Sequence, residues 1–190
     1  MKKFLMVLLI CMTAVAANAQ YRDVRLPDAP KKANYRNYDA DEKGFWCAIE
    51  TEGGSSVMVH STNMQYVSLS WTGGYRLNEF LRFGAGLGIR YYVNNADVRD
   101  TDNKFGVPIY ANARGNFISA YDRDGVPFWS INVGGITNDG FFASPTLGYS
   151  FGGLRNNLQI GINYTITSFR NCNKKDKIYS YFGLKLGYEF

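Results

Sequence analysis

The sequence contains a single histidine, and its neighbours include hydroxyl groups that could take part in catalysis. His60 lies beside Ser55, Ser56 and Ser61 in a polar segment. The next polar segment carries three acidic residues, Asp97, Asp100 and Asp102. A serine activated by a histidine that an acid orients is the arrangement of nucleophilic hydrolases. Because the same residue types fill any hydrated loop, we predict no catalytic residue.

Two acidic stretches, residues 97–103 and 122–125, contain the oxygen ligands that calcium prefers. Neither stretch has the ligand spacing of a known calcium loop. Asp, Asn and Gly at these positions are ordinary turn-forming residues. We therefore predict no metal site and no cofactor.

The elements that would position polar side chains are clearest in residues 178–190. One class consists of the mostly apolar residues Ile178, Ser180, Phe182, Leu184, Leu186, Tyr188 and Phe190. The class that alternates with it consists of Tyr179, Tyr181, Gly183, Lys185, Gly187 and Glu189. Alternation with a period of two predicts a β-strand with one apolar face and one polar face.

The same alternation recurs, so that the chain shows eight amphipathic blocks in all. They are residues 45–52, 66–76, 81–91, 107–117, 129–134, 141–151, 158–167 and 178–190. Strands of about ten residues have the length that a tilted strand needs to cross a bilayer. The pattern predicts an all-β fold, an eight-stranded antiparallel up-and-down transmembrane β-barrel.

The connections between these blocks alternate between two kinds, as an up-and-down order requires. Turns are expected near residues 77–79, 122–125 and 152–157 on the periplasmic side. The opposite side would carry the connections 53–63, 94–106, 137–140 and 168–177. An even number of strands places both ends of the barrel at the periplasmic rim.

Two barrels of opposite polarity fit this alternation, one in a membrane and one soluble and lipocalin-like. The stretch Gly44-Phe45-Trp46 resembles the Gly-x-Trp of lipocalins, but no carboxy-terminal helix follows the last strand. The apolar class is free of charge in all eight blocks, as lipid contact demands. The other class is rich in small residues that fit a crowded lumen, where bulky apolar side chains would not fit. We therefore expect the apolar class to face outward.

Aromatic residues of the outward class gather near the expected periplasmic rim. They are Phe45, Tyr75, Phe117, Trp129, Phe151, Tyr188 and Phe190. Rings at this depth are typical of the aromatic girdle at a membrane interface.

The inward class carries charges, which a narrow lumen would force into pairs. From it we predict a lumen network of Glu50, Glu52, Arg82, Arg90, Arg114 and Lys185, while Arg76 and Glu189 also belong to the inward class. Glu50 and Lys185 should reach similar depths on adjacent strands, and Arg82 and Arg114 should compete for Glu50. Such a network would close the lumen to ions; a hydrated polar core without a gating role is the alternative.

The amino-terminal residues predict export rather than a further domain. Lys2 and Lys3 precede an apolar run that ends in Ala17-Asn18-Ala19, which predicts a signal peptide over residues 1–19, cleaved after Ala19. Residues 20–43 are polar and predict a flexible periplasmic leader before a barrel over residues 44–190. Without Lys2 and Lys3 the basic residues number 19 against 16 acidic ones, which does not favour binding to nucleic acid.

The leader, the eight amphipathic strands and the terminal phenylalanine resemble the small bacterial outer-membrane β-barrel domain family, which is similar to the barrel of outer-membrane protein A. The resemblance covers residues 44–190 and implies contact with outer-membrane lipid and lipopolysaccharide. It also implies that the barrel-assembly machinery reads the last strand at Tyr188 and Phe190. Lys185 departs from this signal, because many family members have glycine there.

These features lead to one functional hypothesis and two alternatives. The hypothesis is a non-enzymatic outer-membrane barrel protein with a structural or loop-presenting role in adhesion or interaction, its lumen plugged by polar and charged side chains. The first alternative is a narrow channel or solute conduit. The second is a lipid A-modifying enzyme, similar to the eight-stranded palmitoyltransferases and deacylases that place a histidine and a serine near the outer rim. The external partner is not predicted by any motif.

Overall fold

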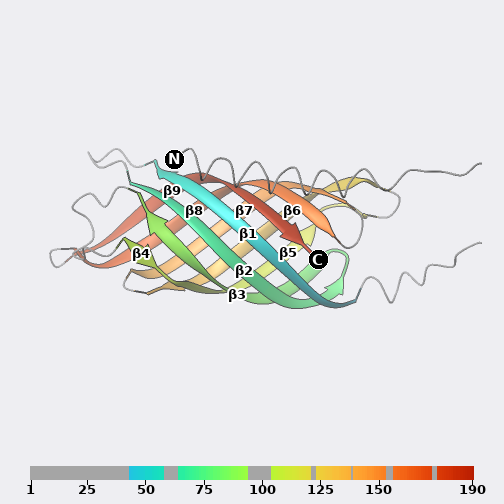
Figure 1. The fold of residues 1–190 in the computed structure, drawn as a ribbon, viewed down its shortest axis with the longest axis horizontal. Helices are drawn as coiled ribbons and strands as arrows, with labels where there is room; N and C mark the ends of the chain where they lie inside the picture. The colour runs from blue at the N-terminus through green and yellow to red at the C-terminus, as the bar shows by residue number, and fades with distance from the viewer. Residues whose placement is uncertain are drawn as a thin grey trace, which may run out of the picture. The chain divides into compact units, whose positions relative to one another are not determined.

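The computed structural model describes residues 43–57, 64–93, 104–120, 123–137, 139–152, 156–172 and 175–190. These residues form a single sheet of strands that curls into a barrel (Figure 1). The predicted signal peptide and all but the last residue of the predicted leader lie outside the described residues. No helix in the described part of the chain is long and apolar enough to span a membrane.

Eight long strands and one short strand build the sheet. They are β1 (Gly44–Ser56), β2 (Gln65–Asn78), β3 (Leu81–Tyr92), β4 (Phe105–Gly106), β5 (Pro108–Asn116), β6 (Gly125–Ile136), β7 (Gly140–Phe151), β8 (Asn157–Cys172) and β9 (Lys175–Glu189). The two-residue β4 directly precedes β5 and pairs with the same neighbour, β3. Each of the eight predicted strands is therefore present.

The barrel closes because the first and last strands pair with each other. Every strand pairs antiparallel with its neighbour in the order β1, β2, β3, β5, β6, β7, β8 and β9, and β9 pairs with β1. At the seam the backbones of Cys47 and Phe190 exchange two hydrogen bonds, of 2.9 and 2.8 Å. The predicted fold class, a closed antiparallel barrel of eight strands, is confirmed.

Several strands extend further than their alternation predicted, among them β1, which continues to Ser56, and β6, which runs from Gly125 to Ile136. β8 continues to Cys172 and β9 begins at Lys175, so most of the predicted loop 168–177 is paired strand. Apart from Phe169, most residues of this segment are polar, so the sequence shows no alternation there, although the backbones of β8 and β9 stay paired. Cys47 is a free cysteine near the opposite end of the barrel from Cys172.

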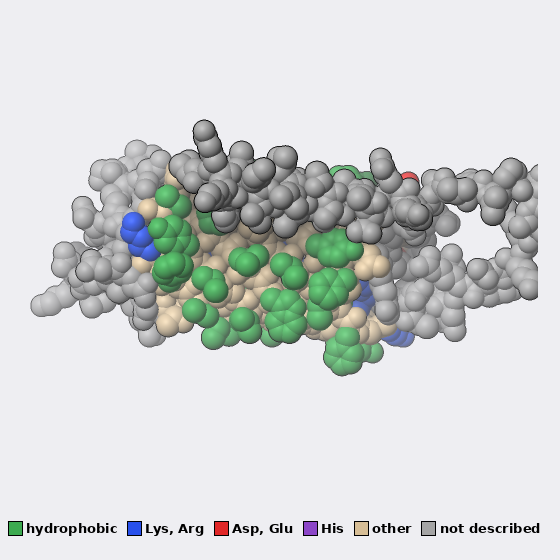
Figure 2. All heavy atoms as spheres, viewed as in Figure 1, with side chains coloured by type: hydrophobic (Ala, Val, Ile, Leu, Met, Phe, Trp, Pro, Cys, Tyr) green, Lys and Arg blue, Asp and Glu red, His purple; other side chains and the backbone are tan. Residues whose placement is uncertain are grey.

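The two residue classes of each strand face in the predicted directions. Outward residues include Phe45 and Leu184, which are 85% and 67% exposed, whereas the inward Glu50 is fully buried. Hydrophobic side chains spread over the visible wall in Figure 2. Near the rim where β1 begins, the rings of Phe45 and Tyr75 meet edge to face at 5.5 Å. A lipocalin-like barrel, with the apolar class inside, is thus excluded.

One expectation about the lumen was wrong, because bulky aromatic side chains do fit inside it. Met64, Tyr66, Tyr92, Phe169 and Tyr181 form a buried cluster, in which Met64 directly precedes β2 and the four rings project from β2, β3, β8 and β9. A second cluster consists of Tyr110, Ile136 and Phe142.

Inward glycines create the space that these rings occupy. A methyl carbon added to Gly54 would lie 2.7 Å from Cε1 of Tyr66, and one added to Gly86 would lie 2.4 Å from Cζ of Tyr110. The inward glycines therefore leave room for the inward aromatic side chains. The lumen is filled by pairs of one large and one small residue rather than by small residues throughout.

Candidate functional site

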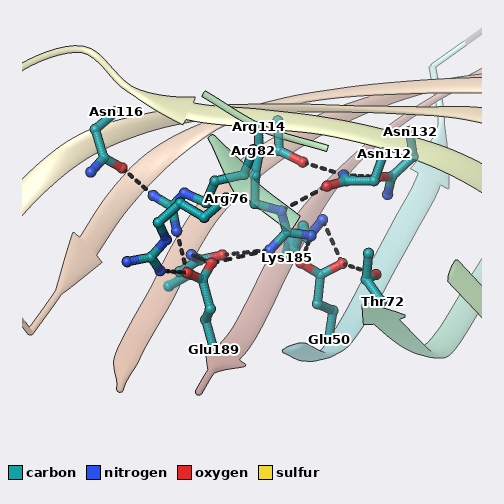
Figure 3. A network of polar contacts seen from close by, with 12 residues as sticks. Glu50, Thr72, Arg76, Arg82, Asn112, Arg114, Asn116, Asn132, Lys185 and Glu189 are labelled. Carbon is teal, nitrogen blue, oxygen red and sulfur yellow. Dashed lines mark hydrogen bonds and ion pairs between the residues drawn. The ribbon is translucent and has the colours of Figure 1, made fainter. Parts of the chain in front are cut away.

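The charged side chains of the lumen come from five strands. β1 supplies Glu50 and Glu52, and its seam partner β9 supplies Lys185 and Glu189. Arg76, Arg82 and Arg114 project from β2, β3 and β5. Figure 3 shows how most of these side chains converge inside the barrel, where each is at most 5% exposed.

Glu50 is the carboxylate at the centre of one half of the network. Its Oε1 lies 2.8 Å from Nη2 of Arg114, and its Oε2 lies 2.9 Å from Nζ of Lys185. Thr72 donates a longer hydrogen bond of 3.4 Å from Oγ1 to Oε2. Two cations on different strands thus share one fully buried carboxylate.

The β1–β9 register explains how Lys185 reaches two carboxylates. Lys185 lies directly opposite Glu52, and Glu50 lies opposite Gly187. The ion pair with Glu50 is therefore diagonal, a contact that long side chains make readily across antiparallel strands. The pair with Glu52 has a longer separation of 3.6 Å. Gly187, which has no side chain, leaves room for the diagonal approach.

Glu189, the last residue of β9, is the centre of the other half. Arg76 donates to its Oε1 at 2.6 Å, and Arg82 makes a short ion pair with the same oxygen. Gln159 donates to Oε2 at 3.0 Å. The alternation predicted that Arg76 and Glu189 point into the barrel among charges that must pair, although neither is one of the six residues singled out for the network.

The prediction that Arg82 competes for Glu50 was wrong. Arg82 lies opposite Arg76 in the β2–β3 register, and both guanidinium groups reach Glu189. Its second partner is Asn116, whose Oδ1 accepts a hydrogen bond of 2.6 Å. The strands of a barrel are tilted and staggered, so counting residues from the rim does not give the depth of a side chain across the lumen.

Arg114 connects the two halves. Besides Glu50, it approaches Oε2 of Glu189 at 3.6 Å and donates from Nε to Asn112 Oδ1 at 2.8 Å. Its guanidinium carbon lies 4.2 Å from the ring centroid of Trp46, which covers one face of the cation. Arg114 is 1% exposed, so its charge is balanced by protein groups rather than by bulk water.

Arg90 lies apart from the ion pairs, although the sequence placed it in the same network. Its guanidinium carbon stacks 4.1 Å from the ring centroid of Tyr66 and 5.3 Å from that of Phe142. Nε and Nη1 of Arg90 are buried without a hydrogen-bond partner. Cation–π contact with these two rings and a hydrogen bond with Tyr92 are therefore interactions that the structure gives this side chain.

Tyr66, on which Arg90 stacks, and Tyr92 belong to the aromatic cluster, and both hydroxyl groups form hydrogen bonds. The Tyr66 hydroxyl lies 3.0 Å from Thr165 Oγ1 and accepts a hydrogen bond of 3.2 Å from Asn163 Nδ2. Tyr92 donates to Asp139 Oδ2 at 2.7 Å. Asp139 was not predicted, because it lies in a short connection where strand alternation gives no direction. The inward parity of Tyr66 and Tyr92 was visible in the sequence but was not interpreted as a separate layer.

The residues considered for catalysis and calcium binding are mostly beyond the described structure. His60, Ser61 and the acidic residues Asp97, Asp100 and Asp102 lie outside the described residues, as does Asp122 of the second acidic stretch. Ser55 and Ser56 belong to the end of β1. The described residues contain no group of three or more side chains that could hold a metal ion. The absence of catalytic, metal and cofactor sites stays a prediction.

Tyr188 and Phe190, the residues of the predicted assembly signal, both project from the outer wall at the seam. They are 41% and 50% exposed, and their ring centroids lie 6.3 Å apart. Tyr188 lies opposite Ile49 in the β1–β9 register. The pair is thus available on the outer surface at the end of the last strand.

Comparison with known proteins supports the fold. No family model matches the sequence, and no curated protein matches it. The crystal structure of Neisserial surface protein A is similar over 76% of this chain and 95% of its own, with a TM-score of 0.50 and 16% sequence identity. The likeness is one of architecture: this chain shares an antiparallel β-barrel fold with that surface protein.

Proposed function

We propose that this chain is a non-enzymatic protein of the bacterial outer membrane that spans the bilayer as a barrel and presents its loops outside. In this proposal the signal peptide is cleaved after Ala19 and the lumen does not conduct solutes. The observation that carries the proposal is the contrast between an uncharged apolar outer wall and a lumen packed with paired charges.

The outer wall suits a hydrocarbon environment. Large hydrophobic side chains that are about 40% exposed or more occur on each of the eight long strands, including Leu69, Leu87, Leu147 and Ile162. In water such a continuous apolar surface would drive association. In a bilayer it needs no partner, and a closed barrel leaves no backbone edge unpaired in lipid.

The lumen suits a barrier rather than a conduit. A conducting pore needs a continuous path of water, whereas Glu50, Arg114 and Lys185 are at most 1% exposed, and Glu50 pairs with both cations inside the barrel. The aromatic cluster around Tyr66 and Tyr92 adds a second layer with a different chemistry. Both layers lie in the path that an ion would take along the axis.

The partners follow from this setting. Lipid and lipopolysaccharide would contact the outer wall, and the assembly machinery would read Tyr188 and Phe190 during insertion. With a packed lumen, the surfaces left for an external partner are the loops that join the strands at the rim opposite the chain's last residue. A structural or adhesive role in the envelope is the function that these surfaces allow.

Planar-bilayer recording of the refolded full-length barrel tests the central claim. We expect no steady single-channel current, with a porin reconstituted in the same lipid as the positive control. A stable unitary conductance would favour the narrow channel instead. The lipid A profile of cells with and without the protein, and with His60→Ala, tests the enzyme alternative; a modification that requires His60 would overturn the proposal.

A further inference from the structure

A notch of about 400 Å³ interrupts the outer wall where β1 lies between β2 and β9. Its floor is the backbone around Gly53, which is opposite Val67 on one side and Leu184 on the other. Ser55 and Gln65 line the notch closer to the ends of β1 and β2, together with the apolar Phe182, which is opposite Ser55, and Val93. None of the residues that line it is charged.

Packing within the protein does not require a glycine at position 53. A methyl carbon added to Gly53 would meet no atom closer than the Tyr66 carbonyl oxygen at 4.0 Å. By contrast, one added to Gly54 would lie 2.7 Å from the Tyr66 ring, and one added to Gly183 would lie 2.3 Å from the Gly53 carbonyl oxygen. Glycine inside a strand costs stability relative to residues with side chains. The space at Gly53 is therefore empty on the outside of the barrel at a cost to the sheet.

We propose that this notch binds one acyl chain of a membrane lipid. The inference rests on the proposed function, because it needs the outer wall to lie in a bilayer. The notch is continuous with the apolar wall, so its occupant must be apolar along Val67 and Leu184. Ser55 and Gln65 supply polar groups toward the strand ends, where the apolar Phe182 and Val93 lie beside them. This arrangement suits an amphiphile whose chain lies along Gly53 and whose polar end faces the rim.

A second copy of the barrel fits the notch less well. A stable protein–protein interface buries about 1,000 Å² or more, and the surface around the notch is a convex barrel wall. A flexible chain can enter a narrow concavity between two strands without such a flat contact area. A lipid chain is also present at high concentration wherever the wall contacts a bilayer.

Native mass spectrometry of the full-length barrel in detergent tests the site, with dimyristoylphosphatidylcholine as the probe. We expect a peak with one bound lipid, and no adduct with glycerophosphocholine, which has the headgroup but no chains. Gly53→Val should fill the notch and weaken lipid binding by about tenfold, the effect of excluding about two methylene groups. Gly135→Val is the matched control, because Gly135 is also an outward glycine whose added methyl carbon would meet nothing closer than 3.6 Å.

Heat-shift electrophoresis first establishes that each variant is folded. If Gly53→Val does not fold, Leu184→Ala removes an exposed wall of the notch instead and should also weaken binding. Equal lipid retention by the wild type and Gly53→Val, or equal loss in both glycine variants, would overturn the inference. So would a dimer that Gly53→Val dissociates. Membrane fractionation separates this inference from the proposed function: variants that reach the outer membrane without retaining lipid refute only the notch.

Discussion

Replacing Glu50 by alanine removes the carboxylate that two buried cations share. Arg114 and Lys185 lie 2.8 and 2.9 Å from it, and neither is more than 1% exposed. Breaking a buried ion pair from one side typically costs about 3–5 kcal/mol. Arg114 retains Glu189 at 3.6 Å, and Lys185 retains Glu52 at 3.6 Å. Since each cation keeps a more distant carboxylate, we expect a loss near the lower limit, about 3 kcal/mol.

Removing Lys185 should lower the free energy of unfolding less than removing Glu50. The described ion pairs join four cations, namely Arg76, Arg82, Arg114 and Lys185, to three carboxylates, Glu50, Glu52 and Glu189. Lys185→Ala leaves Glu50 paired with Arg114, so we expect a loss of about 1.5–3 kcal/mol, the range for a hydrogen bond to a charged group. The two effects should not add, because the same contact is lost in both variants.

These effects form a double-mutant cycle, which can be measured by urea unfolding in detergent micelles with heat-shift electrophoresis as the readout of the folded fraction. The free energy of unfolding of Glu50→Ala, Lys185→Ala and the double variant should show a coupling of about 0.5–3 kcal/mol. Glu50→Gln is the matched variant, since it keeps the shape and removes the charge. Strictly additive losses would refute a direct ion pair. A loss for Glu50→Ala below about 1 kcal/mol would mean that water, rather than protein, balances these charges.

Three further substitutions test other parts of the barrel. Arg90→Leu should cost only about 1–2 kcal/mol in the same unfolding assay, because stacking on Tyr66 is lost and Arg90 takes part in none of the ion pairs among the described residues. Gly86→Ala should cost about 1–3 kcal/mol, because its methyl carbon would lie 2.4 Å from the Tyr110 ring; equal stability would show that the ring moves freely. Phe190→Ala should lower the yield of assembled barrel in cells but leave refolding in detergent unchanged, and an equal defect in both would indicate a purely structural role.

The sequence was sufficient to predict the direction of side chains but not their depth. A period of two assigns Glu50, Arg82 and Lys185 to one face of the sheet, and all three point into the lumen. Which of them meet depends on strand tilt and register, which accumulate around the barrel. Glu50 and Lys185 lie on adjacent strands at the seam, so the error in their relative depth is small and their contact could be predicted. Arg82 is two strands away from β1, and its actual partner is Glu189.

The aromatic layer was missed for a different reason. Composition suggested a lumen of small residues. Many inward residues are indeed small, but the packing depends on which large residue faces which small one. Tyr110 occupies the space that Gly86 leaves, and Tyr66 occupies the space beside Gly54. A large and a small residue at neighbouring positions fill the same volume as two medium ones. Alternation alone does not reveal such pairs, because both members belong to the same inward class.

The low sequence identity to another barrel of this fold follows from what each face requires. An outward position such as Leu147, which is 61% exposed, contacts no fixed partner and needs only to be apolar. Inward positions are constrained in pairs. The residue beside Tyr66 must leave enough volume for the ring, and the residue beside Glu50 must balance its charge. Either member of such a pair can change if the other compensates. Backbone hydrogen bonds hold the closed sheet whatever the side chains are. A fold specified by residue class and by complementary pairs can therefore be shared by two chains that are 16% identical.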